Sequence, residues 1–462
     1  MWASVSAQIR IGEPTPEVLN YCKKELTLAN PDNAKKERMG FWTGDTPKTI
    51  YLYEKDGKEI VLPFGCYDDV VPYASDIFTA FGPEKKVSYD SSVELYDYQR
   101  EAVDRMLKAG RGILQSPAGS GKTQMGIAMI AETGVKALWV THTKDLLKQS
   151  KERAERYLDP KLMGTITEGK VNIGEGITFA TVQTLTKLDL TLYRNTWDMI
   201  IVDECHRVAG TPTKITQFSH VLNSLAAPHK YGLSATVHRS DGLIRATYAL
   251  LGKVVYTVPK EAVADRVMRV GIMPCHTKIP ISLECQNTDG TVNYSGLINY
   301  LAYSYPRDLV ILDKLVRNAE HSCLILSDRL EHLKHLMEML PYALQQKAVM
   351  ISGDMTTVFA KRQRDAAIEL MRSGDKHYLF ATYSLAKEGL DIPCLDRLFL
   401  TTPHHDYAVI TQSIGRIART HEGKGDPIVY DFIDDIPFCE NTYRKRKTTY
   451  RKNGCYFLEE SP

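Results

Sequence analysis

Short runs of consecutive apolar residues, each followed by polar residues, recur along most of the chain. Between residues 89 and 258 they are 112–115, 137–141, 177–180, 197–202 and 230–233, with helical stretches such as 124–131 and 144–157 between them. The pattern returns at 323–327, 349–353 and 378–382, with a helix expected over 357–371. Strands that are apolar at every position are typical of parallel sheets covered on both faces. The alternation predicts two consecutive α/β domains, residues 89–258 and 259–440.

The N-terminal segment, residues 1–88, predicts a small α+β accessory domain. Residues 15–28 suit a helix with Pro16 in its first turn, and the runs 49–53 and 59–62 flank the turn pair Asp56-Gly57, which predicts a hairpin. Its aromatic and basic residues could bind nucleic acid, since bases stack on rings and cations meet phosphates, or could equally form a small core with a solvated rim. They are Lys35, Lys36, Arg38, Phe41, Trp42, Tyr51 and Tyr53.

The last residues, 441–462, are rich in basic and aromatic side chains between Tyr443 and Lys452. Such a run is typical of a solvated chain end, and it could also bind phosphates. We therefore interpret residues 441–462 as a basic tail that follows the second α/β domain.

Composition narrows the class of protein. The 462 residues have room for about three domains, and the net charge is only +2, so any nucleic-acid surface must be local. Nine scattered cysteines include no C-x-x-C pair, which favours a reducing compartment without a disulfide framework or structural zinc. No stretch resembles a signal peptide or a membrane span, so we expect a cytoplasmic protein that does not engage a membrane.

The sequence SPAGSGKT at residues 116–123 lies between a predicted strand and a predicted helix, the context that a phosphate-binding loop requires. Gly119, Ser120 and Gly121 let backbone N–H groups surround phosphates. Lys122 would reach the β and γ oxygens, and the Thr123 hydroxyl could ligate Mg²⁺. Ser116 stands where the motif usually has glycine. The stretch predicts a nucleoside triphosphate site.

The apolar strand 197–202 ends in Asp203-Glu204-Cys205-His206. Asp203 is placed to hold Mg²⁺ through water, and Glu204 to orient or deprotonate the attacking water. Cys205 and His206 do not indicate zinc, because no second Cys/His pair stands at ligand spacing. We expect His206 to hydrogen-bond toward Leu233-Ser234-Ala235-Thr236, so that Ser234 and Thr236 couple the ATP site to a second site.

Hydroxyl, amide and imidazole side chains follow other strands. Thr141 and His142 end one strand, and Thr181 and Gln183 follow another. Such groups suit contacts to a nucleic-acid backbone, although each could also be an ordinary helix cap. Gln99 precedes a helix in Tyr96-Asp97-Tyr98-Gln99-Arg100, and its amide could read an adenine edge or be solvated.

Taken in order, the Gln99 element, SPAGSGKT, DECH and LSAT resemble a superfamily 2 helicase of the DECH type, with two RecA-like domains. The resemblance implies that residues 386–393 form its motif V, with Gly389 and Asp391 between the ATP and nucleic-acid sites, and that Thr382 contacts nucleic acid. It matches Gln412, Gly415, Arg416 and Arg419 to the family's Q-x-x-G-R-x-x-R, Gln412 being a coupling residue. Arg416 and Arg419, three apart on a predicted helix, should share a face and act as arginine fingers.

Two such domains with an N-terminal accessory domain resemble the XPB, RecG and UvsW branch of the superfamily. The resemblance implies ATP and Mg²⁺ as cofactors and an ATP-dependent DNA helicase that unwinds and branch-migrates forked and Holliday-junction DNA in recombination, replication and repair. Branched DNA is the expected partner, and no obligate protein partner is inferred. An RNA helicase or the motor subunit of a restriction or defence system remain alternatives. An ATP-gated clamp is disfavoured because Lys122, Glu204, Arg416 and Arg419 are all present.

Overall fold

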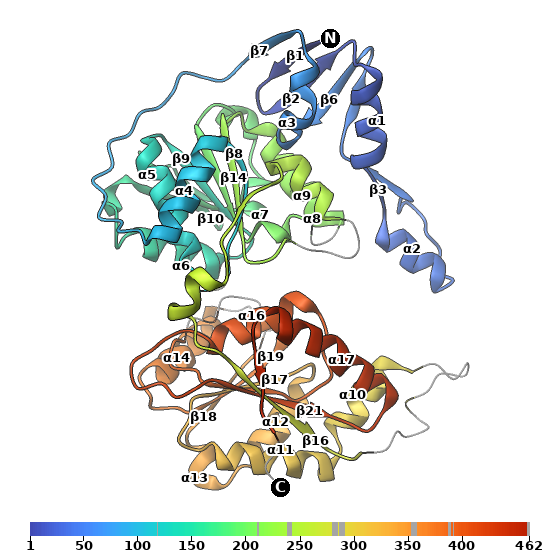
Figure 1. Cartoon of the computed structure of the whole chain (residues 1–462), viewed down its shortest axis with the longest axis vertical. Coiled ribbons are helices and arrows are strands. Elements are labelled where there is room, and N and C mark those ends of the chain that lie inside the picture. The colour runs from blue at the N-terminus through green and yellow to red at the C-terminus, as the bar shows by residue number, and fades with distance from the viewer. Residues whose placement is uncertain are drawn as a thin grey trace. The chain divides into compact units, whose positions relative to one another are not determined.

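The computed structural model describes residues 1–117, 119–209, 212–237, 243–279, 285, 292–352, 358–386, 390 and 392–459. The chain divides into two compact units, Met1–Ala262 and Val263–Pro462, coloured blue to yellow-green and yellow to red in Figure 1. The first unit holds the accessory domain and the first α/β domain. No helix among these residues is long and apolar enough to cross a membrane.

An eight-stranded sheet forms the first α/β domain, in the order β11-β10-β12-β9-β13-β14-β8-β15. Only β11 runs antiparallel to its neighbour. The strands are β8 (Arg111–Gln115), β9 (Ala137–Thr141), β10 (Met163–Thr167), β11 (Lys170–Asn172), β12 (Ile177–Thr181), β13 (Met199–Asp203), β14 (His229–Ser234) and β15 (Val254–Thr257). The helices are α4 (Asp97–Ala109), α5 (Lys122–Thr133), α6 (Lys144–Ala154), α7 (Val182–Leu185), α8 (Pro212–Ser224) and α9 (Ile244–Leu251). Every residue of β9, β12 and β13 is buried, as their unbroken apolar runs predict.

The accessory domain is a five-stranded sheet in the order β5-β6-β2-β1-β7 with helix α1 (Pro16–Glu25). Its strands are β1 (Trp2–Val5), β2 (Gln8–Gly12), β5 (Glu54–Asp56), β6 (Glu59–Pro63) and β7 (Asp76–Thr79). The hairpin turns at Asp56-Gly57 as expected, but its first strand is Glu54–Asp56 and not 49–53. Part of the expected strand is β4 (Thr49–Tyr51), which pairs with β3 (Thr27–Ala29) because Ile50 packs with Leu28 against the first α/β domain.

The accessory domain shares a core with the first α/β domain. Gly65, in the turn η1 (Phe64–Cys66), lies so close to α9 that an added Cβ would be 2.3 Å from the Gly252 nitrogen. The fully buried Lys230 donates hydrogen bonds to the Ala7 and Leu222 carbonyls at 3.0 and 2.6 Å. Asp69 forms an ion pair with Lys253. Residues 1–88 are therefore built into the first unit and are not a loosely tethered module.

The second unit is built on a seven-stranded parallel sheet in the order β18-β19-β17-β20-β21-β16-β22. Its strands are β16 (Gly271–His276), β17 (Cys323–Ser327), β18 (Ala348–Ile351), β19 (Tyr378–Thr382), β20 (Arg397–Leu400), β21 (Ile428–Ile433) and β22 (Tyr456–Phe457). The helices are α10 (Tyr294–Ala302), α11 (Tyr305–Arg317), α12 (Leu330–Met339), α13 (Tyr342–Gln345), α14 (Val358–Arg372), α15 (Tyr383–Ala386), α16 (Tyr407–Ile417) and α17 (Pro437–Lys452).

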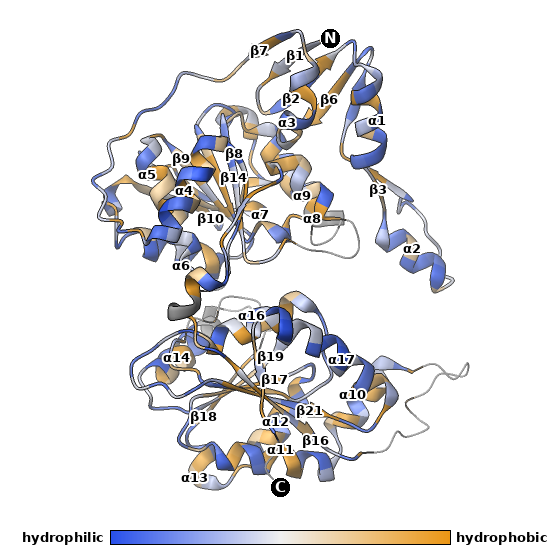
Figure 2. Cartoon of the chain, in the orientation of Figure 1, coloured by the Kyte–Doolittle hydropathy of each residue, from blue (hydrophilic) through white to orange (hydrophobic). Residues whose placement is uncertain are grey.

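The sheet of the second unit is covered on both faces. Leu324 of β17 belongs to one buried cluster and its neighbour Ile325 to another. Figure 2 shows the same layering, with orange strands inside each unit and blue on the outer sides of the helices. Two tandem α/β domains with parallel sheets and a small α+β domain at the N-terminus confirm the predicted fold class.

The basic residues near the C-terminus do not form a free tail, and this expectation was wrong for most of the segment. Residues 441–452 belong to α17, which packs on the second unit. Arg446 is buried and pairs with Asp431, its Nε and Nη2 lying 2.9 and 2.7 Å from the two carboxylate oxygens. Tyr450, one helical turn later, donates to the same carboxylate at 2.6 Å. The basic and aromatic segment is therefore an amphipathic helix, and the buried face of this helix carries an ion pair.

Candidate ATP site and nucleic-acid groove

The phosphate-binding loop joins β8 to α5, and its backbone turns at two glycines. Gly119 and Gly121 have φ values of +83° and +82°, in the left-handed region that glycine adopts without strain. Ser120 Oγ donates to the Pro117 carbonyl at 2.7 Å and lies 2.5 Å from Ser116 Oγ. Lys122 Nζ is 3.4 Å from the Ser116 carbonyl oxygen. Ser116, in the place of the usual glycine, therefore braces the loop through its hydroxyl.

Gln99 holds the same loop from outside. Its Nε2 donates to the Ser120 carbonyl at 2.8 Å, its Oε1 accepts from the Tyr96 N–H at 3.1 Å, and the side chain is 1% exposed. Tyr98 Oη also donates to the Ser120 carbonyl, at 3.0 Å. Both ends of the Gln99 amide therefore make hydrogen bonds within the protein. The structure gives this amide a second role, bracing the loop, besides the adenine contact expected from the sequence.

Asp203 and Glu204 stand at the carboxyl end of β13. Asp203 is nearly fully buried, accepting from its neighbour's N–H at 2.9 Å and from Ser150 Oγ at 3.2 Å. Burial and the adjacent Glu204 carboxylate raise the pKa of Asp203, and the nearby Lys122 ammonium opposes that rise. Glu204 has φ 49° and ψ 49°, a left-handed conformation that is costly for a residue with a side chain. Such strain is typical of a residue held in place for chemistry.

A series of close side-chain contacts leads away from Glu204. Its Oε2 lies 3.2 Å from His206 Nδ1, and the same nitrogen is 3.0 Å from Ser234 Oγ at the end of β14. Ser234 Oγ in turn donates to the Thr236 carbonyl at 2.7 Å and accepts from the Thr236 N–H at 3.2 Å. The structure thus brings together Glu204, His206, Ser234 and Thr236, the contact expected from the sequence.

The second unit carries the two candidate fingers, but not on one helical face. Helix α16 ends at Ile417, so Arg416 is helical and Arg419 lies beyond the helix. The Ala418 carbonyl accepts from the Met268 N–H at 2.7 Å, and Arg419 forms an isolated bridge with Val267. These pairings with residues about 150 positions earlier end the helix and make the shared-face prediction wrong. Arg416 Nη1 donates to the Leu390 carbonyl at 3.1 Å.

Of four other expected residues of the second unit, the structure describes two. Gly389 and Asp391 lie outside the described residues. Gln412 is a partly buried residue in the middle of α16, the helix that Asp406 caps. Thr382 ends β19, where its Oγ1 and Ser384 Oγ share a hydrogen bond of 2.8 Å.

A cavity of about 650 Å³ in the first α/β domain collects most of the expected nucleic-acid residues. His142, Thr181 and Gln183 line it, and Gln183 Nε2 donates to the His142 carbonyl at 2.9 Å. Thr141 does not line it, because it is fully buried and bonded to the Thr143 carbonyl at 3.0 Å. Thr141 therefore shapes the turn that presents His142 to the cavity.

Other residues that line this groove were not predicted from the sequence, namely Thr143, Lys144, Glu168, Gly169, Thr184, Lys187 and Leu188. Lys144 pairs with Glu168, which comes from the turn between β10 and β11. Lys187 follows α7 and adds a second cation. A usable signal was present, because each lysine stands within a few residues of a hydroxyl or amide already singled out.

Comparisons with known proteins agree with this arrangement. The family model described as "Type III restriction enzyme, res subunit" matches residues 92–239, and "Helicase conserved C-terminal domain" matches residues 308–421. The two matches fall on the two α/β domains in the order that helicases have. The chain belongs to helicase superfamily 2.

Three relatives of this helicase show the range of names in the family. A putative ATP-dependent RNA helicase L396 of Acanthamoeba polyphaga mimivirus is 25% identical over 88% of this chain and 76% of its own length. The probable helicase D10 of Escherichia phage T5 is 28% identical over 76% and 74%. The DNA 3'-5' translocase XPB2 of Sulfurisphaera tokodaii is 26% identical over 71% and 79%.

The helicase's first unit fits ATP with Mg²⁺, which the family implies. A Cβ at Gly121 would lie 2.4 Å from Gln99 Nε2, so only glycine leaves the loop room to curl where phosphates bind. Thr123 and Asp203 offer the hydroxyl and carboxylate oxygens that Mg²⁺ prefers, and Lys122 lies close enough to oppose the rise in the pKa of Asp203.

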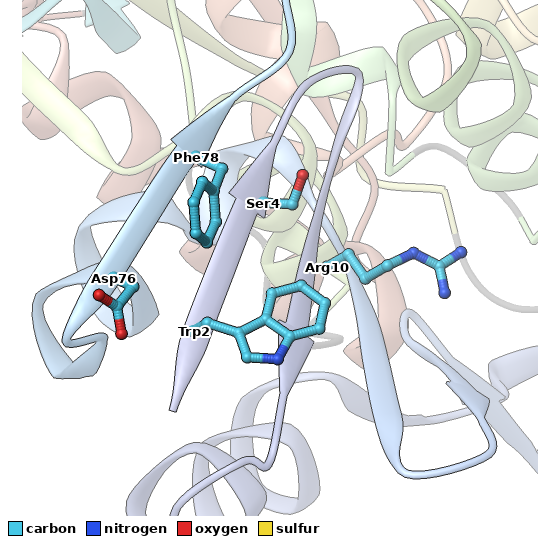
Figure 3. A pocket seen from close by; sticks show the side chains of 5 residues that line it. All are labelled: Trp2, Ser4, Arg10, Asp76 and Phe78. Carbon is cyan, nitrogen blue, oxygen red and sulfur yellow. The ribbon is translucent and has the colours of Figure 1, made fainter.

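A further cavity, of about 500 Å³, lies on the outer face of the accessory sheet (Figure 3). It is lined by Trp2, Ser4, Arg10, Asp76 and Phe78. Arg10 is held by Asp56 and Glu59 at 2.7 and 2.6 Å, so acids surround its charge. The cavity is therefore unsuited to phosphates and stands apart from the helicase's ATP site and groove.

Proposed function

We propose that this helicase uses ATP hydrolysis to unwind and branch-migrate forked and four-way DNA in recombination, replication and repair. The observation that carries the proposal is the position of His206, whose Nδ1 lies 3.2 Å from Glu204 Oε2 and 3.0 Å from Ser234 Oγ. His206 thereby joins the Glu204 carboxylate to Ser234 at the end of β14. A helicase needs such a link, because ATP turnover must change the grip on nucleic acid.

The first unit binds and activates the nucleotide. N–H groups at the start of α5 and the Lys122 ammonium hold the phosphates. Thr123 and Asp203 would hold Mg²⁺, which neutralises charge on the phosphates when it is bound. Glu204 orients the attacking water and accepts its proton, aided by the rigid backbone that holds its carboxylate.

The second unit completes the reaction. Arg416 and Arg419 stabilise the charge that builds on the γ-phosphate, which is the role of arginine fingers in other ATPases. Loss of the γ-phosphate removes their partner and releases the second unit. Repeated binding and release then moves the helicase along one strand held at His142, Thr181 and Gln183.

DNA is favoured over RNA because the relative XPB2 is named a DNA translocase. The accessory domain adds surface to the first unit beyond the two α/β domains. Preference for a branch requires contacts outside the motor, since two lobes that hold one strand do not distinguish a junction from a linear strand. Exposed cations of α17, such as Arg444 and Lys452, could add phosphate contacts.

The test compares ATPase stimulation by single-stranded, duplex, forked and four-way DNA and by RNA of matched length, at one salt concentration. We expect the largest stimulation with forked and four-way DNA, and none in Lys122→Ala. Equal stimulation by all DNA forms would contradict a junction preference. Larger stimulation by RNA would favour the second candidate, an RNA helicase, which the name of the mimivirus relative supports.

A further inference from the structure

An arm of the accessory domain, residues 27–51, projects from the first unit and ends in exposed aromatic rings. It consists of β3, α2 (Pro31–Arg38), the tip residues 39–48, and β4 (Figure 1). At the tip, Met39 and Phe41 are more than half exposed, and Trp42 is 86% exposed. Because these three large apolar side chains are close in sequence and exposed together, they indicate a surface that is covered during function.

The tip has a fixed shape. Asn33 Nδ2 donates to the Thr46 carbonyl at 2.6 Å, and Lys36 Nζ donates to Thr46 Oγ1 at 2.7 Å, which ties the tip loop to α2. The Trp42 ring lies over Gly44, where an added Cβ would be 2.7 Å from the ring. The indole therefore contacts the loop on the side of Gly44, and its 86% exposure leaves most of its surface open for stacking.

The base of the arm is fixed to the first α/β domain next to the nucleic-acid groove. Leu28 of β3 and Ile50 of β4 pack against Ile215 of α8. The same helix packs on α7 through the cluster that contains Phe218 and Leu185. Since α7 begins directly after Thr181, which lines the groove, a single helix separates the arm's base from the groove.

The charge around the tip suits nucleic acid. Lys35, Lys36 and Arg38 occupy the last turn of α2, immediately before Met39. Lys35 and Arg38 are exposed, and among the residues that the structure describes neither takes part in an ion pair. Cations beside exposed rings are the combination that binds unpaired nucleotides, because phosphates meet the cations while bases stack on the rings.

We propose that the Trp42 tip is a fixed wedge that stacks on the exposed base pair at the branch point while the motor pulls one strand. Separation of a base pair costs the stacking of its neighbours, and the indole replaces part of that stacking. Because the arm is joined rigidly to the unit that holds the strand, each step of the motor would drive the duplex end against the ring. The inference rests on the proposed helicase function and assigns strand separation to the arm.

The test is the rate of fork unwinding by Trp42→Ala, with Trp42→Phe as the conservative variant and Tyr342→Ala as control. Tyr342 is 76% exposed in the second unit, so its loss removes a similarly exposed ring away from the arm. We expect unwinding by Trp42→Ala to fall about tenfold, which is the size of one base–aromatic stack. ATPase stimulated by single-stranded DNA should stay within about twofold, and Trp42→Phe should recover most of the unwinding.

A second readout places the ring at the branch. With 2-aminopurine as the first base of the duplex, wild-type binding should change its fluorescence, and Trp42→Ala should bind the fork without that change. Normal unwinding by Trp42→Ala would overturn the wedge, as would an equal fall of ATPase and unwinding, which would make the tip a support of the motor. Retained unwinding together with loss of a protein partner would also overturn it. Absence of nucleic-acid-stimulated ATPase in the wild type would instead refute the proposed function itself.

Discussion

Gln99 is the residue at which sequence and structure suggest different roles, and Gln99→Ala separates them. If the amide reads adenine, its loss should weaken ATP and leave GTP unaffected. If it braces the phosphate-binding loop, as its 2.8 Å bond to the Ser120 carbonyl indicates, its loss should weaken both nucleotides equally. The structure therefore predicts a loss that does not depend on the base.

The size of the loss follows from two hydrogen bonds. Each contributes about 1 kcal/mol net. The Ser120 carbonyl keeps the Tyr98 hydroxyl as a partner, and the Tyr96 N–H, at the start of α4, can turn to water, so neither is left wholly unsatisfied. We expect a total of about 1–2 kcal/mol, which corresponds to roughly 5- to 30-fold weaker binding.

The assay is titration with fluorescent ATP and GTP analogues, and Gln124→Ala is the matched control. Gln124 Nε2 also donates to a backbone carbonyl, that of Glu94 at 2.6 Å, but it makes no bond to the loop carbonyl. We expect near wild-type affinity for the control. A loss confined to ATP in Gln99→Ala would refute the brace and restore the adenine-reading interpretation.

Three further predictions follow from other contacts. Glu204→Gln should bind ATP within about threefold of wild type and hydrolyse it at least about 100-fold more slowly, because the amide cannot accept a proton. Near-normal turnover in a DNA-stimulated assay would show that Glu204 does not activate the water. Arg446→Met should lower the free energy of unfolding by about 3–5 kcal/mol by leaving Asp431 buried without its partner, whereas Arg444→Met, an exposed neighbour, should change it by less than about 0.5 kcal/mol in the same denaturant titration. Burial lowers the pKa of Lys230 to about 7, below its value in the unfolded chain, so between pH 7 and about 10 the unfolded state binds more protons and stability should rise with pH. That rise should be smaller in Lys230→Met, and parallel pH profiles would show that Lys230 stays charged when buried.

The sequence predicted those features that depend on local pattern. Uninterrupted apolar runs such as 137–141 and 378–382 became fully or nearly fully buried strands, because a parallel sheet covered on both faces tolerates little else. The phosphate-binding loop could be identified because its glycines, Lys122 and Thr123 are consecutive in the chain. The contact of His206 with Ser234 was also predictable, since His206 follows β13 and Ser234 ends the adjacent parallel strand β14.

The features it did not predict depend on contacts between distant residues. Helix α16 stops before Arg419 because the Ala418 carbonyl bonds to Met268, and no local signal marks that end. The basic segment near the C-terminus is a packed helix because Asp431 receives Arg446, which only the folded sheet reveals. Gln99 donates to a carbonyl 21 positions away, so its sequence neighbours alone could not reveal that it braces the phosphate-binding loop.

The attachment of the accessory domain illustrates the same point. The sequence marks residues 1–88 as a domain of their own but does not show how it contacts the motor. In the structure, removal of residues 1–88 would uncover the buried amino group of Lys230 and the backbone around Gly252 that Gly65 covers. We therefore expect the truncated chain to be unstable, and point variants such as Trp42→Ala are the better test of the accessory domain.

The most direct test of the central claim is branch migration of a mobile four-way DNA junction, followed by gel under single-turnover conditions. The account predicts that the wild type converts the junction to product with ATP and not with ADP. It also predicts that Glu204→Gln binds the junction but leaves it unchanged. Conversion without ATP hydrolysis, or conversion by Glu204→Gln at the wild-type rate, would contradict the account.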